Sequence, residues 1–355
     1  MKEETNFYLE SIIKEINGIK ITVDFRTELL GIIMIIGNYK EKYPFLFNNY
    51  ENKFYVDNII KEFHQYKEDK VIKDFDELVE NHSFNYDAPF TLFLQLDNNL
   101  KVDKLDNYIF NDRLNKDSKV YDFIAELNNF AKKINFKKYY QSNLELYEKM
   151  LNNISGAFKK YNITKFFKNY YGYLNEKELI INLTPFTTDG GYCCNLEDKI
   201  ISCFPIYKEM KKEKLYDSTK KEKYIIQNPL HEFSHGYVNP ITEEYKILTE
   251  KTNLFDDIRD TMKKMAYPYD TEIINEHIIR GIEARFIKLK HKDDDWYTKR
   301  IEQEKALGFI YIDTIIDSLI TYENSRDKYK TLKEFYPEII KNIITKKEMK
   351  KPRNK

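Results

Sequence analysis

Two histidines four residues apart, His231 and His235, flank a glutamate in the segment QNPLHEFSHGYVNP (residues 227–240). Residues at this spacing on a helix lie one turn apart on the same face, so both imidazoles can bind one zinc ion. Glu232 would then act as the general base that takes a proton from a zinc-activated water. Because the chain has only six histidines, this pairing is not expected by chance, and it predicts a zinc site.

Local signals predict where the helix that carries this motif begins and stops. Asn228 is a favoured N-cap residue, and Pro229 fits the first position of a helix. Pro240 disfavours a helical conformation at the residue before it, so we expect the helix to stop at Asn239.

A catalytic zinc site needs a third protein ligand. No further histidine occurs before His277, and the segment TEIINEHIIRGIEARF (271–286) reads as a helix with acidic residues along one face. Glu276 is the predicted ligand, and Glu283 is the alternative. Arg280, four residues after Glu276, can pair with it or with Glu283 and hold the carboxylate in place.

The His-Glu-x-x-His pattern followed by a glutamate on a later helix resembles the gluzincin clan of metallopeptidases. The resemblance implies that His231, His235 and Glu276 bind zinc and that Glu232 is the general base. One departure is Arg280, since the thermolysin-like pattern has an acid at that position. The segments HEFSHGYVNP, ELLGIIMIIGNYKEKY, NEHIIRGIEARF and GFIYIDTII further resemble a bacterial family of metallopeptidase-like proteins of unknown function.

Most of the chain has the apolar periodicity of helices. The segments with this pattern are 56–82, 87–97, 118–134, 143–163 and 301–323. Two short β-branched runs, 178–183 and 199–204, differ, and the turn-forming residues between them predict a β-hairpin with a long loop. We therefore expect an α+β fold that is mainly helical, with a small antiparallel sheet beside the His-Glu-x-x-His helix, as in gluzincins.

The same patterns predict how the chain is divided. We expect a helical N-terminal region over residues 1–165 and a catalytic, metallopeptidase-like region over 166–345. The final segment KKEMKKPRNK (346–355) is basic and is expected to be a disordered tail.

The composition excludes several classes of partner. Lys plus Arg and Asp plus Glu both number 58, so no net charge draws the chain to nucleic acid or to an anionic membrane. The longest apolar stretch, residues 29–36, is far shorter than the ~20 residues that span a bilayer. Three cysteines do not form a disulfide framework, and the first residues lack the pattern of a secretory signal. We expect a soluble, cytoplasmic protein.

These observations predict a zinc metallohydrolase, a metalloendopeptidase that acts on a peptide or protein substrate. Two alternatives stay open. The first is a zinc hydrolase that cleaves a non-peptide amide or ester, since the same metal site serves both reactions. The second is a non-catalytic interaction protein that a metal only braces. Glu232 argues against the second alternative, because a structural metal site does not need a general base.

Overall fold

The computed structural model describes residues 7–47, 52–188, 191–205, 222–250 and 253–350. The chain forms two compact units: unit 1 comprises residues 1–160 and 177–229, and unit 2 comprises residues 161–176 and 230–355. The division differs from the boundary expected near residue 165, because the strands at 178–205 belong with the N-terminal segment. Those strands pair with strands that precede the helices of unit 1.

Unit 1 contains a sheet and eight of the described helices. The strands are β1 (Ile12–Ile16), β2 (Ile19–Val23), β3 (Glu178–Thr184), β4 (Tyr192–Asn195) and β5 (Lys199–Pro205). The helices are α1 (Phe25–Ile36), α2 (Tyr39–Lys42), α3 (Lys53–Phe63), α4 (Lys70–Asn81), α5 (Asp87–Gln95), α6 (Lys119–Lys133), α7 (Phe136–Ser142) and α8 (Leu144–Lys160). The α+β class with mainly helical content is confirmed, although the helix expected over 56–82 is interrupted between α3 and α4.

The described residues of unit 2 form helices joined by turns and loops, and no strand occurs among them. Its helices are α9 (Ile163–Tyr171), the second part of α10 (Glu222–Glu244), α11 (Lys246–Glu250), α12 (Arg259–Lys264), α13 (Asp270–Phe286), α14 (Asp294–Leu307), α15 (Ile312–Asn324) and α16 (Leu332–Lys350). Short 3₁₀ or π-helical turns in the two units span Pro44–Leu46, His64–Tyr66, Tyr108–Arg113 and Ile287–His291. The helix expected over 301–323 is two helices, because Gly308 ends α14 with a left-handed φ of 106°.

The sheet is mixed, so the antiparallel sheet predicted from the sequence is wrong. Its strand order is β1-β2-β3-β5-β4, and β3 runs parallel to both β2 and β5. The two runs expected to form a hairpin do pair, but in parallel. The connection between them contains β4, which turns back and pairs antiparallel with β5. β3 is an inner strand, which explains its nearly continuous apolar run.

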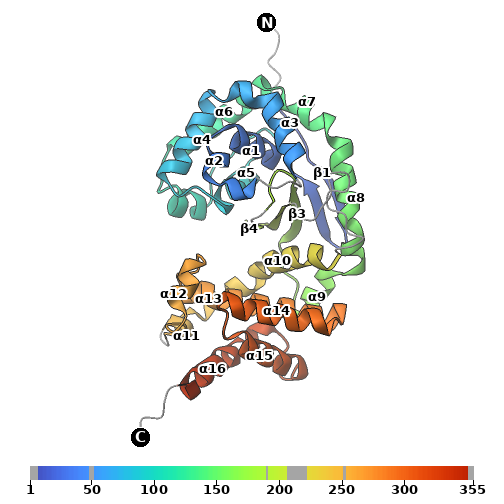
Figure 1. Cartoon of the computed structure of the whole chain (residues 1–355), viewed down its shortest axis with the longest axis vertical. Coiled ribbons are helices and arrows are strands. Elements are labelled where there is room, and N and C mark those ends of the chain that lie inside the picture. Colours follow the sequence, from blue (N-terminus) through green and yellow to red (C-terminus); the bar gives the residue numbers. More distant parts are fainter. Residues whose placement is uncertain (1–6, 48–51, 189–190, 206–221, 251–252, 351–355) are drawn as a thin grey trace. The chain divides into compact units, whose positions relative to one another are not determined.

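A two-residue turn joins β1 to β2, and its sequence is Asn17-Gly18. Both residues have positive φ, 53° and 76°, as a type I′ hairpin turn requires. Helix α8 contacts both strands of this hairpin, and Figure 1 shows it running alongside β1. The first two strands of unit 1 are therefore paired by a local turn sequence, and α8 packs against them.

Helix α13 is the centre of unit 2. It contacts α11, α14 and α15, and nearly all of its residues are buried, including Glu276 and Glu283. Gly281 allows α15 to approach closely, because a Cβ at this position would lie 2.6 Å from the Ile315 side chain. A helix buried on all sides normally carries apolar residues, so the charged residues of α13 need partners inside unit 2.

Helix α10 is longer than the two prolines predict. It begins at Glu222 instead of Asn228 and continues through Pro240 to Glu244. Pro240 has no N–H to donate to the Gly236 carbonyl. The Asn175 side-chain amide donates to that carbonyl at 3.0 Å, and the Asn175 backbone N–H donates to the Tyr237 hydroxyl at 3.1 Å. This tertiary contact compensates for the bond that proline removes, so the helix is not forced to end.

The C-terminal tail also begins differently from the prediction. Residues 346–350 are the last residues of α16, whereas 351–355 lie outside the described residues. Among the helices that the structure describes, none is long and apolar enough to cross a membrane.

A buried carboxyl group in α1 makes the stability of unit 1 depend on pH. Glu28 is 1% exposed and accepts hydrogen bonds from the hydroxyls of Tyr55 and Tyr147. Burial raises its pKa to about 7, although both hydrogen bonds oppose the rise. The protonated carboxyl is therefore favoured in the folded chain. Its contribution to stability is complete below pH 4.5 and is lost as the pH rises through 7.

Glu28→Gln should consequently stabilise the protein at pH 8 by about 2 kcal/mol and leave it nearly unchanged at pH 4.5. Urea unfolding of wild type and variant at the two pH values measures this difference. A variant that is destabilised equally at both pH values would contradict the assignment, since it would indicate lost packing instead of a removed buried charge.

Candidate metal centre

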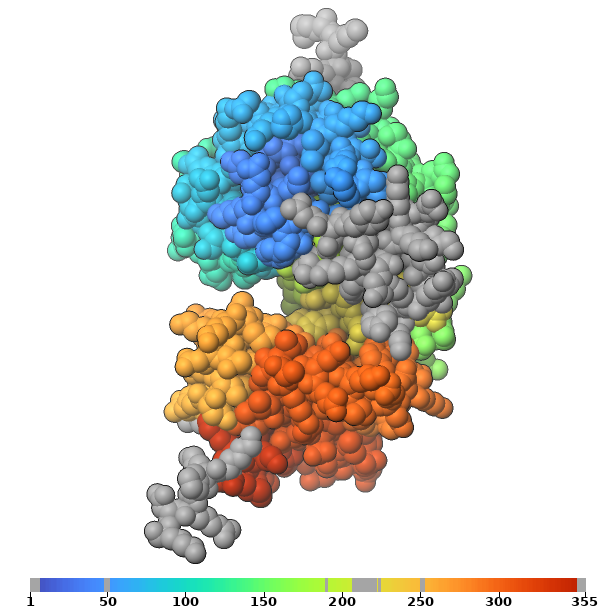
Figure 2. Space-filling view, viewed as in Figure 1, coloured from blue at the N-terminus to red at the C-terminus, as the bar shows by residue number. Residues whose placement is uncertain are grey.

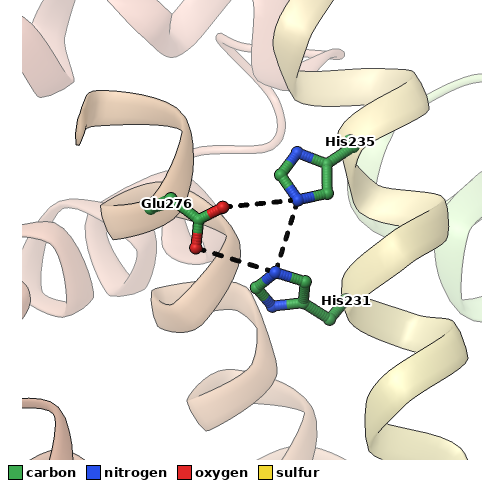
Figure 3. Close-up of side chains that lie close together, drawn as sticks. All are labelled: His231, His235 and Glu276. Carbon is green, nitrogen blue, oxygen red and sulfur yellow. Dashed lines mark hydrogen bonds and ion pairs between the residues drawn. The ribbon is translucent and has the colours of Figure 1, made fainter. Parts of the chain in front are cut away.

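The two histidines of the motif project from adjacent turns of α10. Their Nε2 atoms lie 3.3 Å apart, and their side chains are 15% and 17% exposed. Figure 3 shows both rings directed toward Glu276, which lies on the facing helix α13. The spacing expected from the sequence therefore brings His231 and His235 together on one face of the helix.

Glu276 of α13 completes the group. Its Oε1 lies 3.4 Å from Nε2 of His235, and its Oε2 lies 3.7 Å from Nε2 of His231 (Figure 3). In a tetrahedral zinc site with ligand bonds of about 2.0–2.1 Å, neighbouring ligand atoms are about 3.4 Å apart. The His–His separation is close to this value, and one ligand atom from each of the three side chains lies within 4.8 Å of the others, so the three can converge on one zinc ion. Among the described residues, these three form the only group of candidate metal ligands found.

Hydrogen bonds to the other ring nitrogens determine which nitrogen of each histidine can bind a metal. Nδ1 of His231 lies 3.4 Å from Oε1 of Glu283, and Nδ1 of His235 lies 3.2 Å from Oδ1 of Asn239. A carboxylate and an amide oxygen only accept hydrogen bonds, so each Nδ1 carries the proton. Each Nε2 then faces Glu276, and once it gives up any proton it can offer its lone pair to a metal ion, as a metal-binding histidine does.

Glu283 therefore lies behind His231, on the opposite side of the ring from Glu276. Arg280 donates to Oε2 of Glu276 at 3.0 Å and is 14% exposed. The structure thus separates the two glutamates that the sequence left as alternatives: Glu276 faces both Nε2 atoms, and Glu283 supports one imidazole from behind. Arg280 holds the carboxylate of Glu276.

A family model for a domain of unknown function, DUF4932, matches residues 19–342, which include all of these side chains. The chain belongs to this family. No curated protein and no solved structure matches it significantly. The DUF4932 description names no activity, so only the residues of the site indicate its chemistry.

The charges of the site control its ionisation. Burial opposes the ionisation of Glu276 and of Glu283, but neighbouring positive charges outweigh this effect. Arg300 and then His231 lower the pKa of Glu283 to about 2, and the two histidines and Arg280 lower the pKa of Glu276. Both are therefore carboxylates at neutral pH, as a metal ligand and its support must be.

The remaining site residue predicted from the sequence, Glu232, is 8% exposed. Burial raises its pKa to about 7, against the opposing effect of His231 and with a further rise from Glu276. In the metal-free chain the Glu232 carboxyl therefore changes between its protonated and ionised forms near neutral pH. Burial acts in the opposite direction on His231, but Glu283 and Glu276 raise the pKa of this imidazole to about 9.

Several residues of the site were not predicted. Asn239 could have been inferred, because it lies one turn beyond His235 on the same helix. Tyr267 could not: it precedes α13 and interacts electrostatically with Glu276 and Arg280, and the chain contains 29 tyrosines. Glu304 and Arg300 come from α14 and had no signal in the sequence.

Metal binding distinguishes the roles of the two glutamates. Glu276→Ala should remove stoichiometric zinc, because it leaves only two ligands. Glu283→Gln should keep zinc but bind it about ten- to a hundredfold more weakly, because the neutral amide is a poorer partner for Nδ1 of His231. Elemental analysis and competition with a chelator measure both, with the exposed Glu243→Gln on α10 as a control. Zinc that is retained in Glu276→Ala and lost in Glu283→Gln would make Glu283 the third ligand.

Proposed function

We propose that this DUF4932 protein is a zinc-dependent hydrolase that cleaves peptide bonds. One observation carries the proposal: two Nε2 atoms and a carboxylate converge with the separations of a tetrahedral zinc site, while both Nδ1 atoms are held by acceptors. Nitrogen and carboxylate ligands in this set are typical of catalytic zinc, which keeps one coordination position for water. The gluzincin resemblance is consistent with the same ligands.

His231, His235 and Glu276 would hold the ion. Zinc bound there supplies a Lewis acid that makes water a nucleophile near neutral pH. Glu276 remains ionised because Arg280 and the histidines stabilise its charge. Asn239 and Glu283 keep the two imidazoles oriented, so the ligand set is already arranged before an ion arrives.

Glu232 supports catalysis over a purely structural metal. It adjoins His231 in sequence, forms no ion pair with another residue that the structure describes, and is nevertheless buried. A structural site has no use for an additional buried carboxylate, whose burial costs free energy. In hydrolysis it would accept a proton from the attacking water and pass it to the leaving group.

Tyr267 supplies the remaining element, a hydrogen-bond donor beside the metal ligands. Burial and then the charge of Glu276 raise the pKa of Tyr267 to about 12, and the charge of Arg280 opposes this rise. The phenol therefore keeps its proton at neutral pH. We propose that it donates to the oxygen on which negative charge develops when a carbonyl is attacked.

A cytoplasmic location remains part of the proposal. Cys194 and Cys203 are both free thiols in unit 1, although their Sγ atoms are only 4.0 Å apart. An odd number of cysteines without a disulfide framework is expected in a reducing compartment. The substrate would accordingly be a cytoplasmic peptide or protein.

Replacing the general base tests the proposal. Glu232→Gln should keep stoichiometric zinc and lose about a hundred- to ten-thousandfold in kcat/KM, because the amide cannot accept the proton. Zinc content and cleavage of a fluorogenic peptide library are measured on wild type, Glu232→Gln and Glu243→Gln. A zinc-loaded wild type that cleaves amides or esters but no peptide would point to the non-peptide alternative. Equal cleavage by wild type and Glu232→Gln would reject the mechanism.

Removal of one hydroxyl tests the second role. Tyr267→Phe should lower kcat by about ten- to a hundredfold with unchanged zinc content and a smaller change in KM. Tyr269→Phe is the matched control, since this neighbouring tyrosine is 66% exposed. If both variants behave like wild type, Tyr267 is not the donor.

A further inference from the structure

The ligand set is connected to a larger group of charged side chains that extends into α14. Arg280, which holds Glu276, also donates to both carboxylate oxygens of Glu304, at 3.2 and 3.0 Å. Arg300 lies 2.7 Å from Glu304 and donates to Oε2 of Glu283 at 2.9 Å. Since Glu283 contacts His231 and His231 faces Glu276, the contacts close into a ring. We call it the charged ring; its members are His231, Glu276, Arg280, Glu304, Arg300 and Glu283.

Glu304 contacts none of the metal ligands directly, and an arginine stands between it and each glutamate of the charged ring. Helix α14 forms part of the surface of unit 2 in Figure 2, but the Glu304 side chain is only 1% exposed. Its two arginine partners lead to different glutamates, and each of those glutamates contacts a histidine of the site. Glu304 therefore links the Arg280–Glu276 pair to the Arg300–Glu283 pair.

We propose that Glu304 is a positioning residue of the metal centre, which holds Glu276 and His231 in ligand geometry through Arg280 and Arg300. This inference rests on the proposed zinc site. It assigns Glu304 no contact with the metal or the substrate. Its effect is transmitted by two arginines: Arg280 uses one guanidinium nitrogen for Glu304 and the other for Glu276, and Arg300 contacts Glu304 and Glu283 through a single nitrogen.

The cost of burying charge supports this role. Removing a carboxylate and two guanidinium groups from water is expensive, and apolar side chains of similar size often stabilise a fold equally well. Buried ion networks are therefore weak evidence for stability, and a geometric role explains this one better. Phe309 adds to the restraint: the guanidinium of Arg280 lies 4.4 Å from the centre of its ring, which fixes the plane of the donor group.

The charged ring also predicts that the two ligands are coupled. Without Glu304, Arg280 and Arg300 each keep one carboxylate partner but lose the group that fixes their separation. Glu276 and the Glu283–His231 pair can then move independently, so fewer conformations of the metal-free site have all three ligand atoms in place. Zinc affinity should fall even though every ligand is present.

Glu304→Gln in the full-length protein tests the proposal. The matched control is Glu323→Gln, which removes the same charge from another glutamate–arginine pair of unit 2, with Arg285 at 2.6 Å. We expect Glu304→Gln to bind Zn²⁺ about ten- to a hundredfold more weakly in chelator competition and Glu323→Gln to bind like wild type. The visible absorption of the Co²⁺-substituted protein, which reports ligand geometry, should change in Glu304→Gln alone.

Two results would overturn the inference. One is a Zn²⁺ affinity and a Co²⁺ spectrum of Glu304→Gln that match wild type. The other is a loss of affinity in both variants that follows their loss of thermal stability without metal, which indicates a structural role. If Glu304→Gln does not fold, Arg280→Lys replaces it. This variant keeps the charge but cannot donate to Glu276 and Glu304 through two separate nitrogens, as the arginine does, so it should bind Zn²⁺ several-fold more weakly. Wild type that binds no Zn²⁺ would reject the metal site itself, and this inference with it.

Discussion

A carboxylate inside a protein is tolerated only beside compensating charge, and α13 carries two of them, Glu276 and Glu283, in the interior of unit 2. This constraint organises the surrounding helices. The histidines of α10 contact the two glutamates, and so do Arg280 of α13 and Arg300 of α14. Each glutamate therefore has both a histidine and an arginine partner. The arrangement that makes the carboxylates tolerable also holds Glu276 where the proposed zinc site requires it.

Helical periodicity explains why this is possible with two helices. His231 and His235 are four residues apart, and Glu276 and Glu283 are seven apart, so each pair lies along one face of its helix. Glu276 contacts both imidazoles through Nε2, whereas Glu283, two turns later, reaches only Nδ1 of His231. Glu276 is thereby placed at the candidate metal site, and Glu283 lies behind one of its histidines. The difference in role between two chemically identical side chains follows from their heights along α13.

The same periodicity explains what the sequence could and could not predict. Spacing along one helix is enough to predict the faces that carry His231, Glu232, His235 and Glu276. The apolar periodicity of the surrounding segments likewise predicts most of the other helices. Glu304 lies on α14, and its pairing with Arg280 is set by how helices pack, which spacing within one helix does not contain. The ends of α10 were mispredicted for a related reason, since the hydrogen bond from Asn175 that replaces the one lost at Pro240 is tertiary. Likewise, β3 and β5 are close in sequence, but the short β4 between them reverses the expected pairing from antiparallel to parallel.

The departure from the thermolysin-like pattern at Arg280 has a physical explanation in these contacts. That pattern has an acid four residues after the ligand glutamate to support a histidine, whereas here the supporting acid is Glu283, seven residues after Glu276. The position between them must then neutralise two buried carboxylates, and an acid there would add a third negative charge to the same face. Arginine at position 280 resolves the conflict, because its guanidinium binds Glu276 and reaches Glu304 as well. In this chain the supporting acid at position 283 and the arginine at position 280 therefore depend on each other, and Glu304 and Arg300 complete the charge balance.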